Sequence, residues 1–577
     1  MTTQTLSSQP ARPSFAELYT PKLVTVLREG YTLANFRADF MAGLTVAIVA
    51  LPLSMAIAIG SNATPAQGLY TSIVGAFFVS VLGGSRFQMG GPAGAFIVLV
   101  AATVQQHGMD GLILAAILSG LMLMAIGYLR LGTYIKFIPY PVTIGFTAGI
   151  AVTIFSGEIT NLFGLSLSSP EPGPFLKKIP FLWENISTFS PATLVLSLAS
   201  IAAMVVLRIV RPRWPGMLIV VALAALATAL LKLPVETIGT QFGGIPRTLP
   251  MPALPAISLE KVQAVLPNAI SLTLLGAIES LLSAVVADSM TGRRHRSNCE
   301  LVGQGVANIM SGLFGGICVT GNVARTATNV RAGAHGPIAG VMHSVFLLLF
   351  ILVAAPLASY IPLAVLAAVL AVVCWNMVER HAFAALLRAS RGDAAILLAT
   401  LGITLFRGLT EAIVVGFALG SVLFIHRMSQ TTAVETAVPL VGEDTADDGS
   451  RGIYDEKAQQ DPSVVVYRIS GAFFFGAASS IGAVLERIGD GHRNLVVDFA
   501  AVPFVDSTGA RTIEGLAHKA SARGVGVYLT GTSANVKKEL AAHGVRPPLV
   551  RIASTIDQAL KDIRKKEPAH EAPIPVS

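Results

Sequence analysis

GGICVTGNVARTATNVRAG, residues 315–333, interrupts an otherwise apolar chain with glycines, places Asn322 close to Arg325, and resumes as a run of small residues. An earlier stretch, GGSRFQMGGPAGAF (83–96), repeats the same order of a Gly-Gly pair, a short extended segment, a second glycine signal and a helix start. Glycine and proline weaken a continuous helix by roughly 1 and 3 kcal/mol per residue. We therefore predict two half-helices that begin near Pro92 and Asn322, each preceded by extended backbone. The alternative is a chance similarity of two glycine-rich stretches.

The composition predicts a protein with many membrane-spanning helices. Of the 577 residues, 53% are hydrophobic and only 13% are charged, whereas roughly 25% of the residues in a soluble protein are charged. Several apolar runs are long enough, alone or with their flanks, to cross a hydrocarbon core roughly 30 Å thick. Clear examples are FMAGLTVAIVALPLSMAIAIG (40–60), LILAAILSGLMLMAIGYL (112–129), LVLSLASIAAMVVL (194–207) and VMHSVFLLLFILVAAPLA (341–358).

Charge placement predicts the orientation of these spans. Hydropathy indicates about a dozen clear spans, and the two interrupted segments raise the expected number to about fourteen. Alternating connections then place most basic residues on one side, while the connections 61–67 and 158–184 fall on the other. The positive-inside rule makes the basic side cytoplasmic, so we expect both termini in the cytoplasm and the chain in the inner (cell) membrane. The basic residues on that side are Arg86, Arg130, Lys136, Arg208, Arg211, Arg213, Arg293, Arg294, Arg296, Arg380, Arg388, Arg391 and Arg427.

The chain divides into five predicted parts. These are a cytoplasmic N-terminal segment (1–37), a transmembrane transport domain (38–430), a linker (431–462), a small cytoplasmic α/β domain (463–566) and a C-terminal tail (567–577). The linker is acidic, rich in Gly, Pro and Ser, and has no periodicity. In the α/β domain, strand-like runs alternate with amphipathic stretches. The expected strands are 464–469 and 494–500, and the expected helices are 479–489, 512–524 and 536–544.

The half-helices predict an anion site inside the membrane. A helix that begins there leaves several backbone N–H groups without partners, at a cost of several kcal/mol each in hydrocarbon. Each terminus also carries about half a positive charge, so two facing termini and Arg325 supply roughly two positive charges. That charge suits sulfate, a dicarboxylate or bicarbonate. Small residues at these positions let a ligand approach the backbone: Ala93, Gly94, Ala95, Gly321 and Ala324. Alternatively, Arg325 is a structural ion-pair partner or faces a water-filled vestibule.

Glu279 is the second charge predicted within the membrane. It lies in SLTLLGAIESLLSAVVADSMTG (271–292), which otherwise reads as a spanning helix, and a charge there costs roughly 2.5 to 3.5 kcal/mol. Ser283 lies one turn further on the same face. An ionised Glu279 about 5 Å from a bound anion would repel it by about 3 kcal/mol at an effective dielectric near 20. A proton or Na⁺ on Glu279 would remove that repulsion and couple cation to anion binding. The alternative is a structural Glu279–Arg325 ion pair.

Other classes of function find little support in the sequence. The chain shows no nucleophile with a paired base, no metal-ligand spacing and no P-loop, so we expect neither an enzyme nor a bound cofactor. Cys299, Cys318 and Cys374 lie far apart in the sequence and predict neither a disulfide framework nor a zinc site. The formal charge of +8 reflects membrane topology and does not predict nucleic-acid binding.

These motifs resemble the sulfate permease (SulP) family of anion transporters over nearly the whole chain. The resemblance rests on residues 276–344, DFMAGLTVAIVALPLSMAIA (39–58), GLYTSIV (68–74) and residues 83–96. It implies fourteen spans in two inverted seven-helix repeats, forming core and gate domains, in a protein that is usually dimeric. VDFAAVPFVDSTGARTIEGL (497–516) resembles the STAS signature, in which the serine of DS-x-G is phosphorylated in some proteins. Here that serine is Ser507, although Asp506 and Ser507 also suit a helix cap, which is the reading we prefer. We expect this domain to bind a cytoplasmic regulator or to serve assembly.

The resemblance also implies roles for particular residues. The family's anion lies between the N-termini of the third and tenth spans, which here are Ala93 to Ala95 and Gly321, Asn322, Val323, Ala324 and Arg325. Sodium-coupled bicarbonate members bind Na⁺ through an aspartate, a hydroxyl one turn later, and backbone of the tenth span. The matching residues are Glu279, Ser283, Gly321 and Asn322. Glutamate in place of aspartate favours a proton, and Leu53 stands where some bacterial relatives carry an acidic residue.

The sequence therefore predicts a secondary active anion transporter embedded in the lipid bilayer. We expect proton-coupled uptake of sulfate or a C4-dicarboxylate, because residues of the eighth to twelfth spans are most similar to a bacterial C4-dicarboxylate/proton symporter. The alternatives are a sodium-coupled bicarbonate transporter and an uncoupled anion channel or exchanger.

Overall fold

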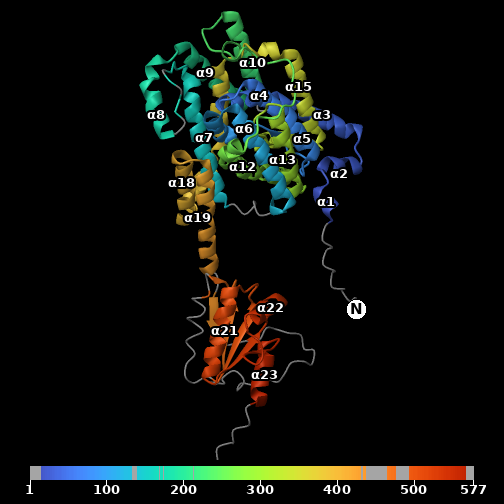
Figure 1. Cartoon of the computed structure of the whole chain (residues 1–577), viewed down its shortest axis with the longest axis vertical. Helices are drawn as coiled ribbons and strands as arrows, with labels where there is room; N and C mark the ends of the chain where they lie inside the picture. The colour runs from blue at the N-terminus through green and yellow to red at the C-terminus, as the bar shows by residue number, and fades with distance from the viewer. Residues whose placement is uncertain are drawn as a thin grey trace, which may run out of the picture. The chain divides into compact units, whose positions relative to one another are not determined.

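The computed structural model describes residues 14–132, 139–167, 169, 171–172, 175–211, 214–430, 433–436, 464–475, 478 and 493–566. It divides into two compact units, Met1–Gly420 and Ser421–Ser577, which are described separately (Figure 1). The first unit is helical, and the second contains a five-stranded sheet. The predicted helix 479–489, most of the predicted linker and the C-terminal tail lie outside the described residues.

The helical unit begins with two short helices and continues with long apolar ones. Among its described residues, eight helical segments are long and apolar enough to cross a membrane, and they contain the four runs quoted above except for Leu129. The first half contains α1 (Phe15–Tyr19), α2 (Lys22–Arg28), α3 (Leu33–Gly60), α4 (Pro65–Tyr70), the π-helical turn η1 (Thr71–Gly75), α5 (Ala76–Leu82), β1 (Gly90–Gly91), η2 (Gly94–Phe96), α6 (Ile97–Tyr128), α7 (Tyr140–Phe163), α8 (Phe175–Glu184), η4 (Ile186–Thr188), α9 (Pro191–Val210), α10 (Gly216–Leu231) and α11 (Ile238–Phe242).

The second half, like the first, consists of long helices and one segment in which a short strand precedes a helix. It contains α12 (Leu259–Thr291), α13 (Ser297–Leu313), β2 (Thr320–Gly321), α14 (Val323–Arg331), α15 (Ile338–Ala358), α16 (Leu363–Met377), α17 (Arg380–Ala389), α18 (Arg391–Phe406) and α19 (Leu409–Gln430). Helices α6, α12 and α13 lie near the centre of this unit, with α8, α9 and α18 to one side (Figure 1). Because the fold interleaves its halves, α13 and α12 pack along α6, and α15 packs along α3.

Local sequence signals account for several helix boundaries. The Gly108 backbone has a φ of 70°, so α6 is two helices joined at this residue rather than one rod. Thr64 and Gln67 form a capping box at the start of α4, and the Ser258 hydroxyl caps α12. Helix α7 continues through Glu158, which we had expected in an outer connection, and ends at Gly164 in the left-handed conformation. The expected loop therefore begins several residues later, because no glycine or proline lies between Glu158 and Gly164.

Asp39 anchors one end of α3 to the segment that follows α14. Its carboxylate is fully buried and accepts hydrogen bonds from the His335 and Gly336 N–H groups at 2.6 and 2.9 Å. Its other oxygen accepts from the Tyr31 hydroxyl at 2.6 Å. Burial and this carboxylate raise the pKa of Tyr31, so the phenol remains a donor.

We expect Asp39→Asn to lower the free energy of unfolding by about 2 kcal/mol, because the remaining oxygen is uncharged and the NH₂ group cannot accept from the Tyr31 hydroxyl. The measurement is the thermal unfolding midpoint in detergent. Asp110→Asn, at an exposed position on α6, is the matched control. Equal midpoints for the two variants would show that the Asp39 contacts do not stabilise the fold.

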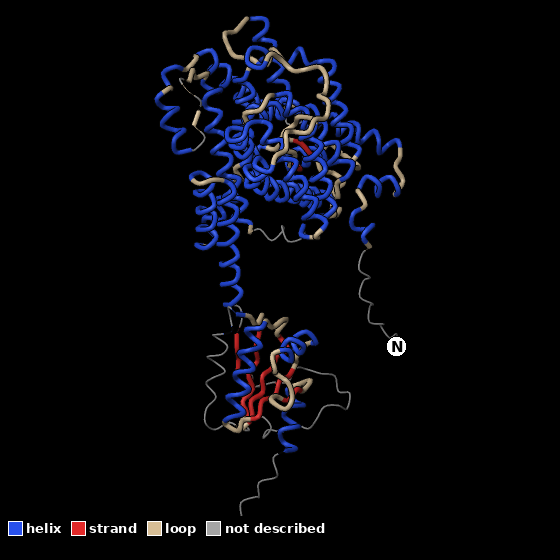
Figure 2. Tube along the Cα trace, in the orientation of Figure 1, coloured by secondary structure: helices blue, strands red, loops and turns tan. Residues whose placement is uncertain are grey.

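The C-terminal unit is the predicted α/β domain. Its sheet has the order β3-β4-β5-β6-β7, with β3 antiparallel to β4 and the other pairs parallel, and Figure 2 shows helices flanking it. The strands are β3 (Ala433–Thr436), β4 (Val464–Ser470), β5 (Asn494–Ala501), β6 (Gly526–Thr530) and β7 (Arg551–Ile552), and the helices are α21 (Ser507–Ala522), α22 (Ala534–Ala542) and α23 (Ile556–Lys566). Strand β3 lies inside the segment that we predicted as a linker.

The STAS-like motif forms the start of α21. Asp506 is the N-cap, and its carboxylate accepts a hydrogen bond from the Gly509 N–H at 2.8 Å. Ser507 is the first helical residue and is exposed, with its hydroxyl 3.4 Å from Glu539 Oε1. Of the two residues that we expected to cap this helix, Asp506 therefore makes the capping bond.

Candidate functional site

The two interrupted segments meet inside the helical unit. Strands β1 and β2 pair antiparallel, with Gly90 opposite Gly321 and Gly91 opposite Thr320, and Figure 2 shows the pair among the helices. Glycine is needed at Gly91, which has a φ of 150° and where a Cβ would lie only 2.1 Å from Arg325 Nη1. The predicted extended backbone on both stretches is confirmed, and the similarity of the two stretches extends to a direct contact between them.

Each strand is followed by the start of a helix. Ala93 has extended backbone and precedes η2, which leads into α6, and Asn322 is the N-cap of α14. These positions confirm the predicted half-helices. Among the described residues, five N–H groups at the two helix starts have no hydrogen-bond partner, those of Ala93, Gly94, Ala95, Val323 and Ala324. Gly94, Val323 and Ala324 are at least partly exposed, so a ligand can reach these donors.

Asn322 and Arg325 complete the start of α14. The Asn322 carboxamide accepts a hydrogen bond from the Arg325 N–H at 3.1 Å, while its own N–H donates to Met89 O at 2.9 Å. The Arg325 side chain is 1% exposed and donates to Ser72 Oγ at 3.1 Å and Ser54 Oγ at 3.0 Å. Within the described residues it pairs with no carboxylate. A positive charge held only by hydroxyls favours an anion nearby.

Glu279 lies on α12 and has no hydrogen bond or ion pair within the described part of the chain. The alternative of a structural Glu279–Arg325 bridge is therefore not what the structure shows. Glu279 is partly exposed, whereas Ser283 is fully buried with its hydroxyl 2.9 Å from Thr326 Oγ1. The predicted pair thus shares a helix face, but only Glu279 is accessible.

Sequence reasoning missed Ser280, which is the hydroxyl that contacts β2. Ser280 Oγ accepts a hydrogen bond from the Gly321 N–H at 3.2 Å and lies 2.8 Å from Thr320 Oγ1. Thr320 Oγ1 also contacts Gly276 O at 3.2 Å. The spacing Gly276, Ser280, Ser283 places small residues along one face of α12, and that pattern could have identified the face that packs on β2.

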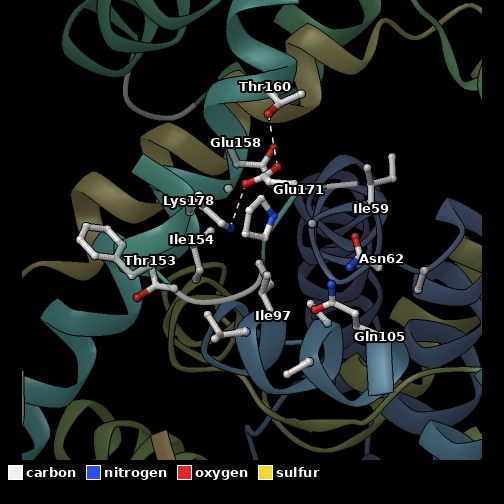
Figure 3. Close-up of a pocket in the computed structure, with 18 of the residues that line it drawn as sticks. Ile59, Asn62, Ile97, Gln105, Thr153, Ile154, Glu158, Thr160, Glu171 and Lys178 are labelled. Atoms are coloured by element: carbon white, nitrogen blue, oxygen red, sulfur yellow. Dashed lines mark hydrogen bonds and ion pairs between the residues drawn. The ribbon is translucent and has the colours of Figure 1, made fainter. Parts of the chain in front are cut away.

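A cavity of about 890 Å³ lies beside the first helical half. Ile97, the first residue of α6, lines it together with Asn62 and Gln105, and Glu158 lies beside Glu171 across the cavity (Figure 3). Lys178 forms an ion pair with Glu171 at 3.0 Å. The cavity therefore extends from charged side chains on α7 and α8 to the first turn of α6, and it forms a candidate vestibule for the site.

Two half-helices whose starts leave N–H groups free and partly exposed, within a bundle of apolar helices, define an anion transporter of the membrane. The comparisons agree with this class. Residues 36–400 match the sulfate permease family and residues 457–559 match the STAS domain. The chain belongs to the sulfate permease family, and like its relatives it is a transporter and not an enzyme.

Two relatives are similar over most of the chain. A putative sulfate transporter, YvdB of Bacillus subtilis, is 37% identical over 90% of this chain and 95% of its own length. The bicarbonate transporter BicA of Synechocystis is 31% identical over 88% of this chain and 90% of its own length. The names of these two relatives refer to different anions, sulfate and bicarbonate. The similarity therefore establishes the family but does not identify the substrate of this chain.

Solved structures show the same fold. The transmembrane domain of a cyanobacterial bicarbonate transporter BicA superposes with a TM-score of 0.59 at 29% identity, covering 67% of this chain and 98% of that one. The murine anion transporter Slc26a9 in its inward-facing state gives 0.83 at 19% identity, covering 98% and 97%. The latter likeness shows that the helical unit and the C-terminal domain occur together in one known architecture.

Proposed function

We propose that this chain is a proton-coupled symporter of a divalent oxyanion, sulfate or a C4-dicarboxylate. The observation that carries the proposal is the unpaired, partly exposed carboxylate of Glu279, on the helix that contacts β2, in a site otherwise built from positive groups. An ionised carboxylate there opposes the anion, and a protonated one does not. The five free N–H groups and Arg325 hold the anion, and Glu279 carries the proton.

The second candidate is sodium-coupled bicarbonate transport. It is favoured by the similarity to BicA and by the hydroxyl that Ser280 brings to Gly321. In this case Na⁺ would bind the Glu279 carboxylate with Ser283, Gly321 and Asn322 as the resemblance implies, or with Ser280, whose hydroxyl contacts Gly321, in place of Ser283. Oxygen ligands of this kind suit a hard cation.

Orientation and assembly belong to the same proposal. The distribution of basic residues supports a cytoplasmic position for both termini of a protein held in the inner membrane. We expect a homodimer and a cytoplasmic regulator of the STAS domain. Ser507 is exposed and therefore accessible to phosphorylation.

A counterflow panel in proteoliposomes tests the proposed substrate and coupling ion. Sulfate, succinate, fumarate, bicarbonate and chloride are compared at two pH values, with and without Na⁺. We expect sulfate or a dicarboxylate to exchange, and its net uptake to increase as the external pH falls, independently of Na⁺. Bicarbonate transport that requires Na⁺ would select the second candidate, and chloride current without cation coupling would indicate a channel.

A further inference from the structure

Unpaired polar atoms gather along the extended backbone that leads into the first half-helix, residues 83–91. Among the described residues, six polar side chains larger than serine lie around this backbone, are exposed by 5% or less and carry at least one nitrogen or oxygen without a hydrogen-bond partner. We call them the polar seam. They are Gln88, Glu300, Gln304, Arg325, Asn329 and His343.

The seam begins at the end of α5. There Glu300 Oε2 accepts a hydrogen bond from the Ser85 N–H at 2.8 Å, while Glu300 Oε1 is unpaired. Further along, the Asn329 amide donates to Phe87 O at 2.9 Å, and its oxygen is unpaired. Each side chain thus uses one polar atom to hold the extended backbone and leaves the other free.

The middle of the seam consists of two glutamines. Both amide atoms of Gln88 are unpaired, and its Nε2 packs so closely on Gly321 that a Cβ there would lie 2.0 Å away. Gln304 donates to Val319 O, which also accepts from Asn308 at 2.8 Å, and Gln304 Oε1 is unpaired. The two amides therefore contact residues 319 and 321, which are two positions apart on the extended chain that leads into β2.

The seam ends at the half-helix starts. Arg325 Nη1 lies against Gly91, and Arg325 Nε is unpaired. On α15, Gly340 packs against the unpaired Ser80 hydroxyl and the Met89 sulfur, and His343 carries two unpaired ring nitrogens one turn later. The unpaired atoms therefore follow residues 83–91 from one end to the other.

A hydroxyl pair connects the seam to the candidate coupling residue. Thr326 Oγ1 accepts a hydrogen bond from the Met89 N–H at 3.0 Å and lies 2.9 Å from Ser283 Oγ. Ser283 is one helical turn from Glu279, on the same face of α12. Hydroxyl groups can donate and accept at once, so this pair lies between the Glu279 face of α12 and Met89 and would need a bound water at each end to continue toward Glu279 and the seam.

We propose that ordered water molecules bind along the polar seam and form the route by which the coupled proton leaves Glu279 for the α5 end of the helical unit. Buried polar groups in native proteins are almost always satisfied, and where protein groups do not do so, bound water does. A proton that leaves the Glu279 carboxyl enters the chain of waters, and one proton leaves that chain beside Glu300, so charge balances. The route rests on the proposed proton coupling, whereas the hydration of the seam does not.

Hydroxyl-radical labelling of the full chain in lipid nanodiscs tests the hydration. Radiolysis turns bound water into radicals that oxidise adjacent side chains, and methionine sulfur reacts readily. Met89, which borders the seam, and Met55, which packs in the apolar core, are both 0% exposed. We expect Met89 to be oxidised several-fold faster than Met55, as measured by mass spectrometry. Equal slow oxidation of both would mean that the seam is dry and would overturn the proposal.

Gln88→Met tests the route, because it removes two unpaired atoms without removing a protein hydrogen bond. We expect Met89 labelling to fall several-fold and the kcat of proton-driven uptake to fall with it. Anion KM and counterflow, which moves no net proton, should stay unchanged. Gln263→Met, at an exposed position on α12, is the matched control and should alter none of these.

The outcomes separate the inference from the proposed function. If Gln88→Met lowers labelling but leaves proton-driven uptake intact, the seam is hydrated and the proton takes another route. If wild-type uptake proves independent of protons, the proposed function fails, while Met89 labelling still decides whether the seam holds water.

Discussion

Glu279→Gln is expected to abolish the pH dependence of anion uptake. The glutamine keeps the size of the side chain but cannot ionise, so anion binding no longer gains from protonation. An ionised carboxylate some 5 Å from the anion repels it by about 3 kcal/mol. Replacing the ionised carboxylate with a neutral amide is therefore expected to raise anion affinity at high pH by up to about 100-fold. The measurement is uptake into proteoliposomes across a pH series, at saturating and subsaturating anion concentrations.

The sign of the effect follows from the direction of coupling. In the wild type, higher pH leaves Glu279 more ionised, so the anion KM rises with pH. In Glu279→Gln, the KM should stay at its low-pH value throughout, and concentrative uptake driven by a proton gradient should disappear while counterflow persists. Glu260→Gln is the control, because Glu260 is exposed in the first turn of the same helix. pH-dependent uptake that survives in Glu279→Gln would remove Glu279 from the coupling mechanism.

The half-helices could be predicted from the sequence because their signals are local. Glycine pairs, Pro92 and Asn322 act within a few residues of themselves, and the structure begins both helices within two residues of the predicted positions. Glu279 was predictable for a similar reason, since an ionisable group in an apolar helix is costly wherever that helix packs.

Features that depend on packing between distant segments could not be predicted. Ser280 and Ser283 are equally plausible hydroxyls in the sequence, and only the rotation of α12 against β2 brings Ser280 to Gly321. The sequence predicts Glu158 in the connection 158–184, whereas α7 continues past it to Phe163. Strand β3 was missed because four residues show little periodicity and the strand forms by pairing with β4.

The unpaired atoms of the polar seam also depend on contacts between distant segments and not on local sequence signals. Gln88, Gln304 and His343 are ordinary polar residues in the sequence, and nothing local shows that their neighbours leave them unpaired. Their common position along residues 83–91 follows from three helices that pack around one extended segment. The proposed proton route therefore depends on contacts between helices that form only when the bundle folds.

Gly94→Val is expected to block anion binding while the protein still folds. A Cβ at Gly94 would meet only Met377 Sδ, at 3.3 Å, so a valine fits after a small shift of that flexible side chain. The added methyl groups would stand in front of the free N–H groups of η2. Loss of even one hydrogen bond to a charged ligand, about 1.5 to 3 kcal/mol, weakens binding by roughly tenfold or more.

Two further glycines make this test specific. Gly402→Val, on α18, places the same side chain where a Cβ would meet nothing within 4 Å, and it should leave the anion KM unchanged. A substitution at Gly321 would be less informative, because a Cβ there collides with Gln88 and would disturb the β1–β2 contact as well as the ligand. Binding is measured as the concentration of anion that protects against thermal unfolding. Undiminished protection in Gly94→Val, with Gly402→Val behaving as wild type, would place the anion away from the start of η2.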